Sequence, residues 1–320
     1  MNSDMNGLKM PLPVNKPVIV LLGPTAVGKT ALSIELAQQF SGEIISVDSR
    51  YIYKGMDIGT AKPGKVEMQG IPHHLINIAD PDEPISLAQF QSAVYERIEA
   101  VFKRGKIPFL VGGTGQYLWS VVEVWLPPKT EHDSKFRKVF EELANEIGAG
   151  EIYKMVVFLD PEAAKKIEPN NLRRSIRALE VIFSTGELFS KQKAKNPPPY
   201  DFKIIGLQRT RAELYERVDR RIDQMLAEGL IQETERLIAH GYDPNLPSMS
   251  AIGYKEITRY LQQEISLEEA IAQIKKRTRI FIRHQANWFK KDDPRIRWFD
   301  VHPTVIYEIS VFLKSNEGWV

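Results

Sequence analysis

Eight residues near the N-terminus have the types and the spacing of a phosphate-binding loop. They fit the pattern G-x-x-x-x-G-K-[ST] and are, in order, Gly23, Pro24, Thr25, Ala26, Val27, Gly28, Lys29 and Thr30. The glycines allow the backbone to form a ring of N–H groups around an anion, and a following helix adds its positive dipole end. Lys29 would reach the terminal phosphates, and the Thr30 hydroxyl would hold a phosphate-bound Mg²⁺. The motif therefore predicts a site for a phosphate compound together with Mg²⁺.

The segments around this loop indicate the fold that positions it. Apolar runs at 18–22, 43–48, 107–111 and 202–207 have the length and composition of short buried strands. Segments with helical spacing separate them, and the first of these begins near Lys29. Alternating strands and helices predict an α/β class, here a P-loop NTPase-like parallel sheet flanked by helices.

Two polar residues come directly after predicted strands. Asp48 ends the run at 43–48, and Thr114 lies in the glycine turn after the run at 107–111. In open α/β sheets, ligands bind beyond the carboxyl ends of the strands, so both side chains are expected in the same crevice as Lys29. On local sequence alone, Asp48 could also be a capping residue.

Proline clusters divide the chain. Pro127-Pro128 and Pro197-Pro198-Pro199 bracket a segment whose apolar spacing is helical throughout. We therefore predict a core domain of residues 1–126 and 200–320, with a helical insertion domain at 127–199 that is hinged on stiff proline segments. One helix of this insertion carries three basic residues, Arg173, Arg174 and Arg177.

Composition narrows the class of protein. The 320 residues carry a net charge of only +2, so any affinity for nucleic acid must come from a local patch. Cysteine is absent, which excludes disulfides, zinc–thiolate sites and cysteine catalysis and predicts a cytoplasmic protein. No apolar run approaches the length of a membrane span.

The last long helix is expected to begin near Ser266 and carries a concentration of positive charge. Nine basic residues lie between Lys275 and Arg297, with Phe281, Trp288 and Phe289 among them. This pattern is typical of a solvated helix face or of a nucleic-acid surface.

The usual companions of the phosphate loop are missing. The strand at 107–111 ends in glycine, where an ATPase would have an aspartate, and the pair Asn15-Lys16 lies before the loop, where a guanine-reading motif cannot be. A small-molecule kinase remains possible, but it would not explain the basic C-terminal helix.

Five blocks of sequence together resemble one family, the tRNA dimethylallyltransferases of bacterial type, also called tRNA isopentenyltransferases. The resemblance runs from about residue 18 to residue 300. The blocks, in chain order, are the phosphate loop at 23–30, Ile45-Ser46-Val47-Asp48-Ser49, the segment from Tyr53 to Pro63, Val111-Gly112-Gly113-Thr114 and Ile252-Gly253-Tyr254-Lys255.

The resemblance implies a reaction and roles for its residues. A dimethylallyl group would pass from dimethylallyl diphosphate to N6 of the adenosine immediately 3′ of the anticodon, tRNA position 37. Asp48 would be the base for the N6 amine, Lys29, Thr30 and Mg²⁺ would stabilise the departing diphosphate, and Arg221 would clamp it. Thr25 and Thr114 match positions that line the reaction channel.

The resemblance also implies a tRNA-binding surface, and we expect the protein to be a monomer. The residues that match family contacts to the tRNA anticodon stem-loop are Asp48, Ser49, Arg50, Tyr51, Arg137, Arg173, Arg174, Ser175, Ile176, Arg177, Ser250, Ala251, Ile252, Gly253, Tyr254 and Lys255. The adenine must leave its stack to reach the diphosphate.

Two other functions stay open on the sequence. An adenylate isopentenyltransferase would share the loop and the carboxylate but would prenylate free AMP, ADP or ATP. A non-enzymatic, nucleotide-dependent RNA-binding protein would use Asp48 only as a cap.

Overall fold

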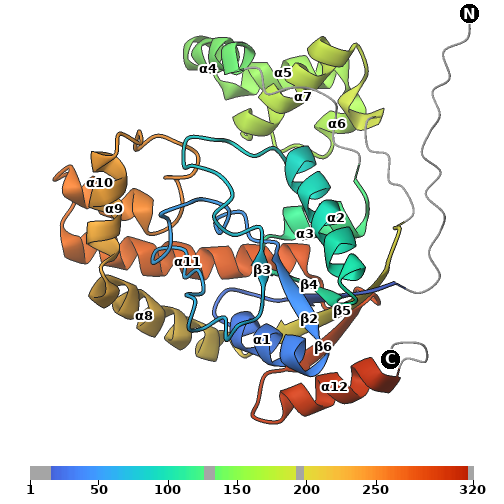
Figure 1. The fold of residues 1–320 in the computed structure, drawn as a ribbon. Coiled ribbons are helices and arrows are strands. Elements are labelled where there is room, and N and C mark those ends of the chain that lie inside the picture. The colour runs from blue at the N-terminus through green and yellow to red at the C-terminus, as the bar shows by residue number, and fades with distance from the viewer. Residues whose placement is uncertain (1–15, 126–133, 192–197, 316–320) are drawn as a thin grey trace, which may run out of the picture. The chain divides into compact units, whose positions relative to one another are not determined.

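The computed structural model describes residues 16–125, 134–191 and 198–315 (Figure 1). The chain divides into two compact units, one of residues 1–122 with 198–320 and the other of residues 123–197. We call them the core unit and the insertion unit; the sequence analysis placed the boundaries of the insertion at 127 and 199. Of the predicted proline hinges, Pro127, Pro128 and Pro197 lie outside the described residues.

The core unit contains one six-stranded sheet in the order β3-β2-β4-β1-β5-β6, and all of its strand pairs are parallel. The strands are β1 (Pro17–Leu22), β2 (Gly42–Ser46), β3 (His73–His74), β4 (Ile107–Gly112), β5 (Asp201–Gln208) and β6 (Ile296–Asp300). The predicted fold class and the four predicted strands are thus confirmed. The two edge strands, β3 and β6, were not predicted.

The centre of the sheet is strand β1. It is almost entirely apolar because it is covered on both faces, and Val18 to Leu22 have no exposed surface. Its neighbours β4 and β5 pair with it in register, so that Leu22 lies opposite Gly112 on one side and Gly206 on the other. The carboxyl ends of the three central strands therefore lie level with one another.

Helices flank the sheet and extend the core unit (Figure 1). Ser86, Thr210 and Ser266 each begin a helix with a capping box, in which the cap and the residue three positions later bond each other's backbone. The helices of this unit are α1 (Lys29–Gln39), α2 (Leu87–Lys103), α3 (Gly115–Val122), α8 (Arg211–Glu228), α9 (Leu230–Ala239), α10 (Tyr254–Leu261), α11 (Leu267–Trp288) and α12 (Val305–Ser315). No helix in the described part of the chain is long and apolar enough to span a membrane.

In the insertion unit, residues 134–191 form helices joined by short turns and have a core of their own. Ile152, Val156 and Leu179 are fully buried in it. Asp160 caps a short helix that begins at Pro161, a pair of residues that favours the start of a helix. Its helices are α4 (Ser134–Ile147), α5 (Ala149–Leu159), α6 (Pro161–Ala164), α7 (Leu172–Thr185) and the 3₁₀ turn η1 (Phe189–Lys191).

Candidate active site

The phosphate-binding loop connects β1 to α1 at the carboxyl edge of the sheet. Gly23 has a φ of +152°, and a side chain there would place its Cβ 2.7 Å from the backbone oxygen of Leu207 on β5. Gly28 has a φ of +110° and is the N-cap of α1. Both positions need glycine, since other residues rarely adopt positive φ. The loop therefore presents the N-terminus of α1 to an anion.

Two arginines hold the loop from the side of β5 and α8. Arg217 Nε donates a 2.7 Å hydrogen bond to the backbone oxygen of Ala26, and Arg209 Nε donates a 3.2 Å hydrogen bond to that of Val27. Their charges add to the positive field around the loop. The sequence analysis did not assign either residue to the site. Arg209 follows the carboxyl end of β5, so the rule that selected Asp48 could have found it.

A buried glutamine holds the loop from the side of α11. Gln285 Oε1 accepts a hydrogen bond from the backbone N–H of Thr25 at 2.9 Å, and Gln285 Nε2 donates to the backbone oxygen of Gly113 at 3.0 Å. The amide thus ties the phosphate loop to the glycine turn after β4. Sequence reasoning missed it, although a signal exists: Gln285 stands between Ile282 and Phe289 on the face of α11 that is otherwise apolar.

The side chain of Lys29 lies inside the loop. Its ammonium donates to the backbone oxygens of Gly23 and Pro24 at 3.0 and 2.9 Å. Burial lowers the pKa of Lys29 to about 8, while the carboxylate of Asp48 raises this pKa and the guanidinium of Arg221 lowers it. Asp48 and Arg221 are therefore within electrostatic range of Lys29, so three of the predicted catalytic residues lie near one another.

Asp48 and Thr114 lie beyond the ends of β2 and β4. Asp48 Oδ1 accepts a hydrogen bond from the backbone N–H of Arg50 at 2.9 Å, and Thr114 Oγ1 accepts one from the N–H of Ser49 at 3.3 Å. Asp48 is half-buried. Asp48 therefore caps its own turn, which is the structural role that the local sequence allowed. Its charge also acts on Lys29.

Arg221 and Tyr51 converge on one backbone carbonyl. Arg221 Nη2 donates to the oxygen of Ala61 at 3.3 Å, and the hydroxyl of Tyr51 donates to the same oxygen at 2.8 Å. Burial and the nearby charge of Asp48 raise the pKa of Tyr51 to about 12, against the opposing effect of Arg221. Tyr51 is thus a neutral hydrogen-bond donor beside the carboxylate and the guanidinium.

The residues present fit the predicted Mg²⁺. Thr30 lies in the first turn of α1 and keeps part of its surface exposed. Among the described residues there is no cluster of three or more His, Cys, Asp or Glu that could hold a metal by themselves. Mg²⁺ commonly binds through one or two protein oxygens and the phosphates of a substrate, so a hydroxyl inside a phosphate loop suits it.

Two of the arginines that are predicted to contact tRNA form ion pairs within the insertion unit. Arg137 and Arg177 bond Glu180 at 2.8 and 2.7 Å, and the side chain of Glu180 is only 1% exposed. Burial raises the pKa of Glu180, but the hydrogen bonds from both arginines outweigh it and hold that pKa below its usual range. Arg173 and Arg174 are exposed, whereas the side chains of Ser175 and Ile176 are buried. Contact of these residues with tRNA stays a prediction.

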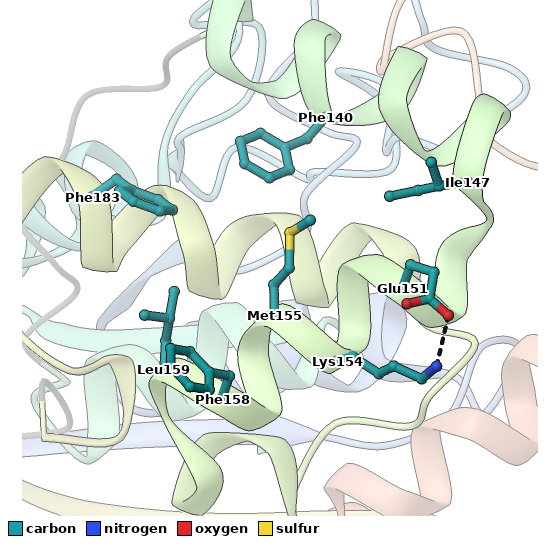
Figure 2. A pocket seen from close by; sticks show the side chains of 8 residues that line it. All are labelled: Phe140, Ile147, Glu151, Lys154, Met155, Phe158, Leu159 and Phe183. Carbon is teal, nitrogen blue, oxygen red and sulfur yellow. Dashed lines mark hydrogen bonds and ion pairs between the residues drawn. The ribbon is translucent and has the colours of Figure 1, made fainter.

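The insertion unit also has an apolar hollow on its surface. Phe140, Met155 and Leu159 lie in it, and Phe158 and Phe183 at its border are 85% and 62% exposed (Figure 2). The Glu151–Lys154 ion pair closes one end. The sequence analysis did not anticipate this feature, because single aromatic residues on helices are indistinguishable from core positions.

The segment 250–255 combines exposed and buried residues. Ser250 and Lys255 are exposed and available to a partner. Tyr254 has no exposed surface, and its hydroxyl donates to the buried carboxylate of Glu233 at 2.5 Å. Contact of the Tyr254 side chain with tRNA, implied by the resemblance, would therefore require this segment to open. Ala251 is buried as well.

Part of the positive charge on α11 is neutralised within the core unit. Three of its cations form ion pairs with acids on α8 and α10, namely Lys275 with Asp223, Arg279 with Asp219, and Arg277 with Glu256. Lys276 and Arg283 are exposed on the same helix. The sequence analysis interpreted this helix either as a solvated face or as a nucleic-acid surface. The structure shows a third role for its charges, which is to form ion pairs with the neighbouring helices α8 and α10.

Comparisons with known proteins place the chain among its relatives. The family model described as "IPP transferase" matches residues 51–292, and one described as "Isopentenyl transferase" matches residues 16–83. This chain belongs to the IPP transferase family. The resemblance stated from the sequence is therefore confirmed.

The IPP transferases include relatives of high identity. A tRNA dimethylallyltransferase of Roseiflexus sp. (strain RS-1) is 50% identical over 86% of this chain and 90% of its own length. One from Dehalococcoides mccartyi is 45% identical over 92% of this chain and 91% of its own length.

Solved structures of IPP transferases share the fold. The tRNA isopentenylpyrophosphate transferase of Bacillus halodurans matches with a TM-score of 0.71 and 41% identity, over 94% of this chain and 96% of that one. A eukaryotic dimethylallyltransferase acting on tRNA matches with a TM-score of 0.80 and 32% identity, over 94% of this chain and 79% of that one.

Proposed function

We propose that this protein is a tRNA dimethylallyltransferase. It transfers the dimethylallyl group of dimethylallyl diphosphate to N6 of the adenosine immediately 3′ of the anticodon, position 37. The observation that carries the proposal is that Lys29 lies inside the phosphate loop at the carboxyl edge of the sheet, where Asp48 follows β2 and where the charges of Asp48 and Arg221 act on it. That arrangement combines an anion cradle with a carboxylate, and the relatives of highest identity bear the name of this activity.

The phosphate loop and its cations receive the diphosphate. Lys29 turns from the backbone oxygens of Gly23 and Pro24 toward the ligand, and the N-terminus of α1 supplies N–H donors. The negative charge that grows on the leaving group as its C–O bond breaks is stabilised by Lys29 and Arg221. Thr30 would hold Mg²⁺, which supplies further positive charge to the diphosphate when bound.

The carboxylate serves the acceptor. An exocyclic adenine amine is a weak nucleophile, because its lone pair is delocalised into the ring. Asp48 Oδ1 is engaged by the N–H of Arg50, while Asp48 Oδ2 is available to take the N6 proton as the N–C bond forms. Diphosphate and the modified tRNA are the products, and Asp48 returns the proton to water.

The acceptor distinguishes this proposal from prenylation of free nucleotide. A free adenylate needs no extended basic surface, whereas exposed cations occur on α11 at Lys276 and Arg283 and on α7 at Arg173 and Arg174. The tRNA would supply many phosphates for such cations. A monomeric, cytoplasmic enzyme remains our expectation.

A single transfer assay tests the function. The protein is incubated with Mg²⁺ and radiolabelled dimethylallyl diphosphate, together with either unmodified tRNA or AMP. We expect label in tRNA at N6 of adenosine 37 and little in AMP. Label in AMP alone would assign the adenylate activity, and binding of tRNA without transfer at any Mg²⁺ concentration would favour a non-enzymatic RNA-binding protein.

A further inference from the structure

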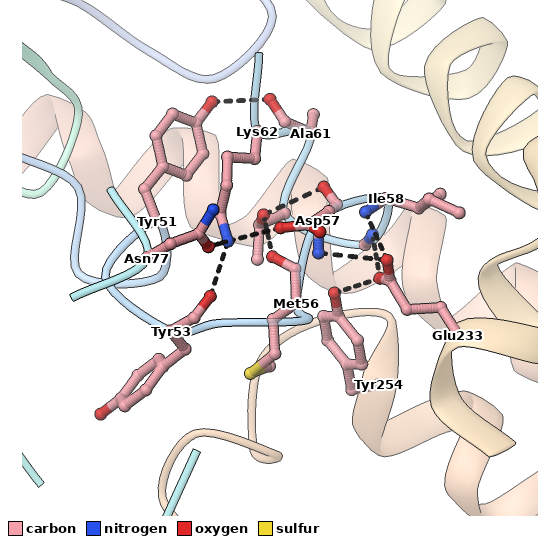
Figure 3. Close-up of polar contacts among 12 residues, drawn as sticks. Tyr51, Tyr53, Met56, Asp57, Ile58, Ala61, Lys62, Asn77, Glu233 and Tyr254 are labelled. Carbon is pink, nitrogen blue, oxygen red and sulfur yellow. Dashed lines mark hydrogen bonds and ion pairs between the residues drawn. The ribbon is translucent and has the colours of Figure 1, made fainter. Parts of the chain in front are cut away.

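Helix α9 carries a buried carboxylate that lies outside the phosphate loop. Glu233 is 4% exposed and accepts hydrogen bonds from the backbone N–H groups of Asp57, Ile58 and Gly59 at 3.1, 2.9 and 3.1 Å (Figure 3). Its fourth donor is the hydroxyl of Tyr254 at 2.5 Å. Burial raises the pKa of Tyr254, so this hydroxyl stays protonated and donates. The two carboxyl oxygens of Glu233 thus accept two hydrogen bonds each.

These bonds fix one turn of the chain, residues 57–62, which we call the 57–62 loop. A side chain at Gly59 would place its Cβ 2.6 Å from the ring of Tyr254, so the loop lies directly on that ring. Lys62 closes the other side, where its ammonium donates to Asp57 Oδ1, to Asn77 Oδ1 and to the backbone oxygen of Tyr53, each at 2.6 Å. The side chain of Lys62 is only 3% exposed (Figure 3). The loop is therefore held on both sides by charged groups in a buried setting.

The same loop ends at the candidate active site. The carbonyl of Ala61 accepts hydrogen bonds from Arg221 and from Tyr51, and the charges of Asp48 and Arg221 both act on the hydroxyl of Tyr51. The position of that carbonyl depends on where the 57–62 loop sits. A continuous set of contacts thus runs from Glu233 through the loop backbone to the guanidinium of Arg221.

We propose that Glu233 is a positioning residue for the transfer reaction. By binding three consecutive N–H groups it sets the 57–62 loop, and the carbonyl of Ala61 in turn orients Arg221 toward the diphosphate and Tyr51 toward Asp48. This inference rests on the proposed function for the identity of the anion that Arg221 meets. The proposed role of Glu233 also explains the segment from Tyr53 to Pro63, which contributes no catalytic group but would position Arg221 and Tyr51.

Binding of Mg²⁺ with pyrophosphate, measured by calorimetry, tests the inference without any turnover. Glu233→Gln replaces one acceptor oxygen by an NH₂ group that cannot accept from the loop. Glu235→Gln is the matched control, since Glu235 lies on the same helix and is exposed. We expect Glu233→Gln to weaken pyrophosphate binding about tenfold, and the control to bind as the wild type does. In the transfer assay we expect Glu233→Gln to raise the KM for the donor and to lower kcat, with the KM for tRNA unchanged.

A double-mutant cycle separates positioning from a general loss of stability. If Glu233 acts through Arg221, then Glu233→Gln will have little further effect on pyrophosphate binding in an Arg221→Ala background. Additive losses, or wild-type binding by Glu233→Gln, would overturn the inference. Should Glu233→Gln fail to fold, as judged by circular dichroism, Tyr254→Phe takes its place in the cycle, because it removes one of the four donors and keeps the ring under Gly59.

The outcomes for the two proposals are distinct. A wild-type protein that binds pyrophosphate but transfers no dimethylallyl group to tRNA would reject the proposed function, and the cycle would still decide the role of Glu233. A wild-type protein that does not bind pyrophosphate with Mg²⁺ would reject both.

Discussion

Gln285 on α11 and Thr25 in the phosphate loop are 260 residues apart in the chain and are joined by a 2.9 Å hydrogen bond between the side-chain oxygen and the backbone N–H. The same amide reaches Gly113 after β4, so one side chain links three segments of the site. The long basic helix is therefore part of the frame of the anion cradle as well as a candidate surface for tRNA.

We expect Gln285→Leu to impair donor binding, because it leaves the N–H of Thr25 and the carbonyl of Gly113 without their partner. Each such buried, unsatisfied group costs about 1–3 kcal/mol, and a loop that loses one such contribution to donor binding should show a fall in kcat/KM for the donor of about one to two orders of magnitude. Asn287→Leu on the exposed side of α11 is the control. Steady-state kinetics at saturating tRNA provide the measurement, and equal behaviour of the two variants would contradict the role of Gln285.

Asp48→Asn separates the two roles of this residue. The amide oxygen can still accept from the N–H of Arg50, so the turn keeps its cap, but the variant cannot take a proton. We expect kcat to fall by about 100- to 10,000-fold, the usual contribution of a general base, with nearly unchanged tRNA affinity. Single-turnover rates and a filter-binding assay measure the two quantities. Undiminished turnover would leave Asp48 with its structural role alone.

The ion pairs on α11 determine which of its charges can report on tRNA. Lys276 and Arg283 are exposed, whereas Lys275 pairs with Asp223 at 2.7 Å. We expect the double variant Lys276→Gln, Arg283→Gln to lower the slope of log K against log salt by about one for each lost phosphate contact. Lys275→Gln should change the slope less. Binding titrations over a range of salt concentrations measure both, and a larger change for Lys275→Gln would place the docking surface on the α8 side.

Acid should weaken the sheet through Glu43. This residue on β2 is 5% exposed and accepts from Arg104 Nε and Nη2 at 2.9 and 2.6 Å and from His74 at 2.7 Å. The hydrogen bonds from Arg104 hold the pKa of Glu43 below its usual value. A lowered carboxyl pKa gives stability that is present above the unfolded pKa, near 4.5, and is lost as the pH falls through the folded value.

Thermal unfolding of the wild type and Glu43→Gln tests this effect. At neutral pH we expect the variant to be less stable by about 1 kcal/mol, because it loses the charge-assisted part of the hydrogen bonds from Arg104, whose side chain is 46% exposed and can turn to water. As the pH falls below about 4, the difference between the two proteins should shrink, because the wild type then loses the same charge. A difference that is constant with pH would show that Glu43 acts through packing.

The parts of the fold that were predictable share one property: their signals are local. Strands such as β1 and β4 are unbroken apolar runs, and the helices after Ser86 and Ser266 begin with capping boxes that can be read from four residues. Strand β6 was missed because only Ile296 and Phe299 of its five residues are buried. Its residue Arg297 was instead counted among the basic residues that follow Lys275. An edge strand with one neighbour needs little apolar surface.

The candidate site was predictable where a motif, a strand end or the family resemblance marked it, and Arg221 was predicted from the resemblance alone. Lys29 and Asp48 were found from the motif and a strand end, while Gln285 and Glu233 were not found, because each acts through a hydrogen bond to backbone groups far away in the sequence. The charges of α11 show the same limit: Arg277 bonds Glu256, 21 residues away, and Arg279 bonds Asp219, 60 residues away. Only the fold brings such partners together.

The position of β5 beside β1 has a consequence for synthesis of the chain. Strand β1 is made first, yet one of its two neighbours in the sheet begins at Asp201, after the insertion has been translated. Until the ribosome has released that strand, the apolar flank of Val18 to Leu22 is an open edge, the kind of surface that recruits other chains. A nascent chain that stalls before residue 200 would thus expose the edge of β1 next to an incomplete phosphate loop, and a chaperone could bind this apolar edge.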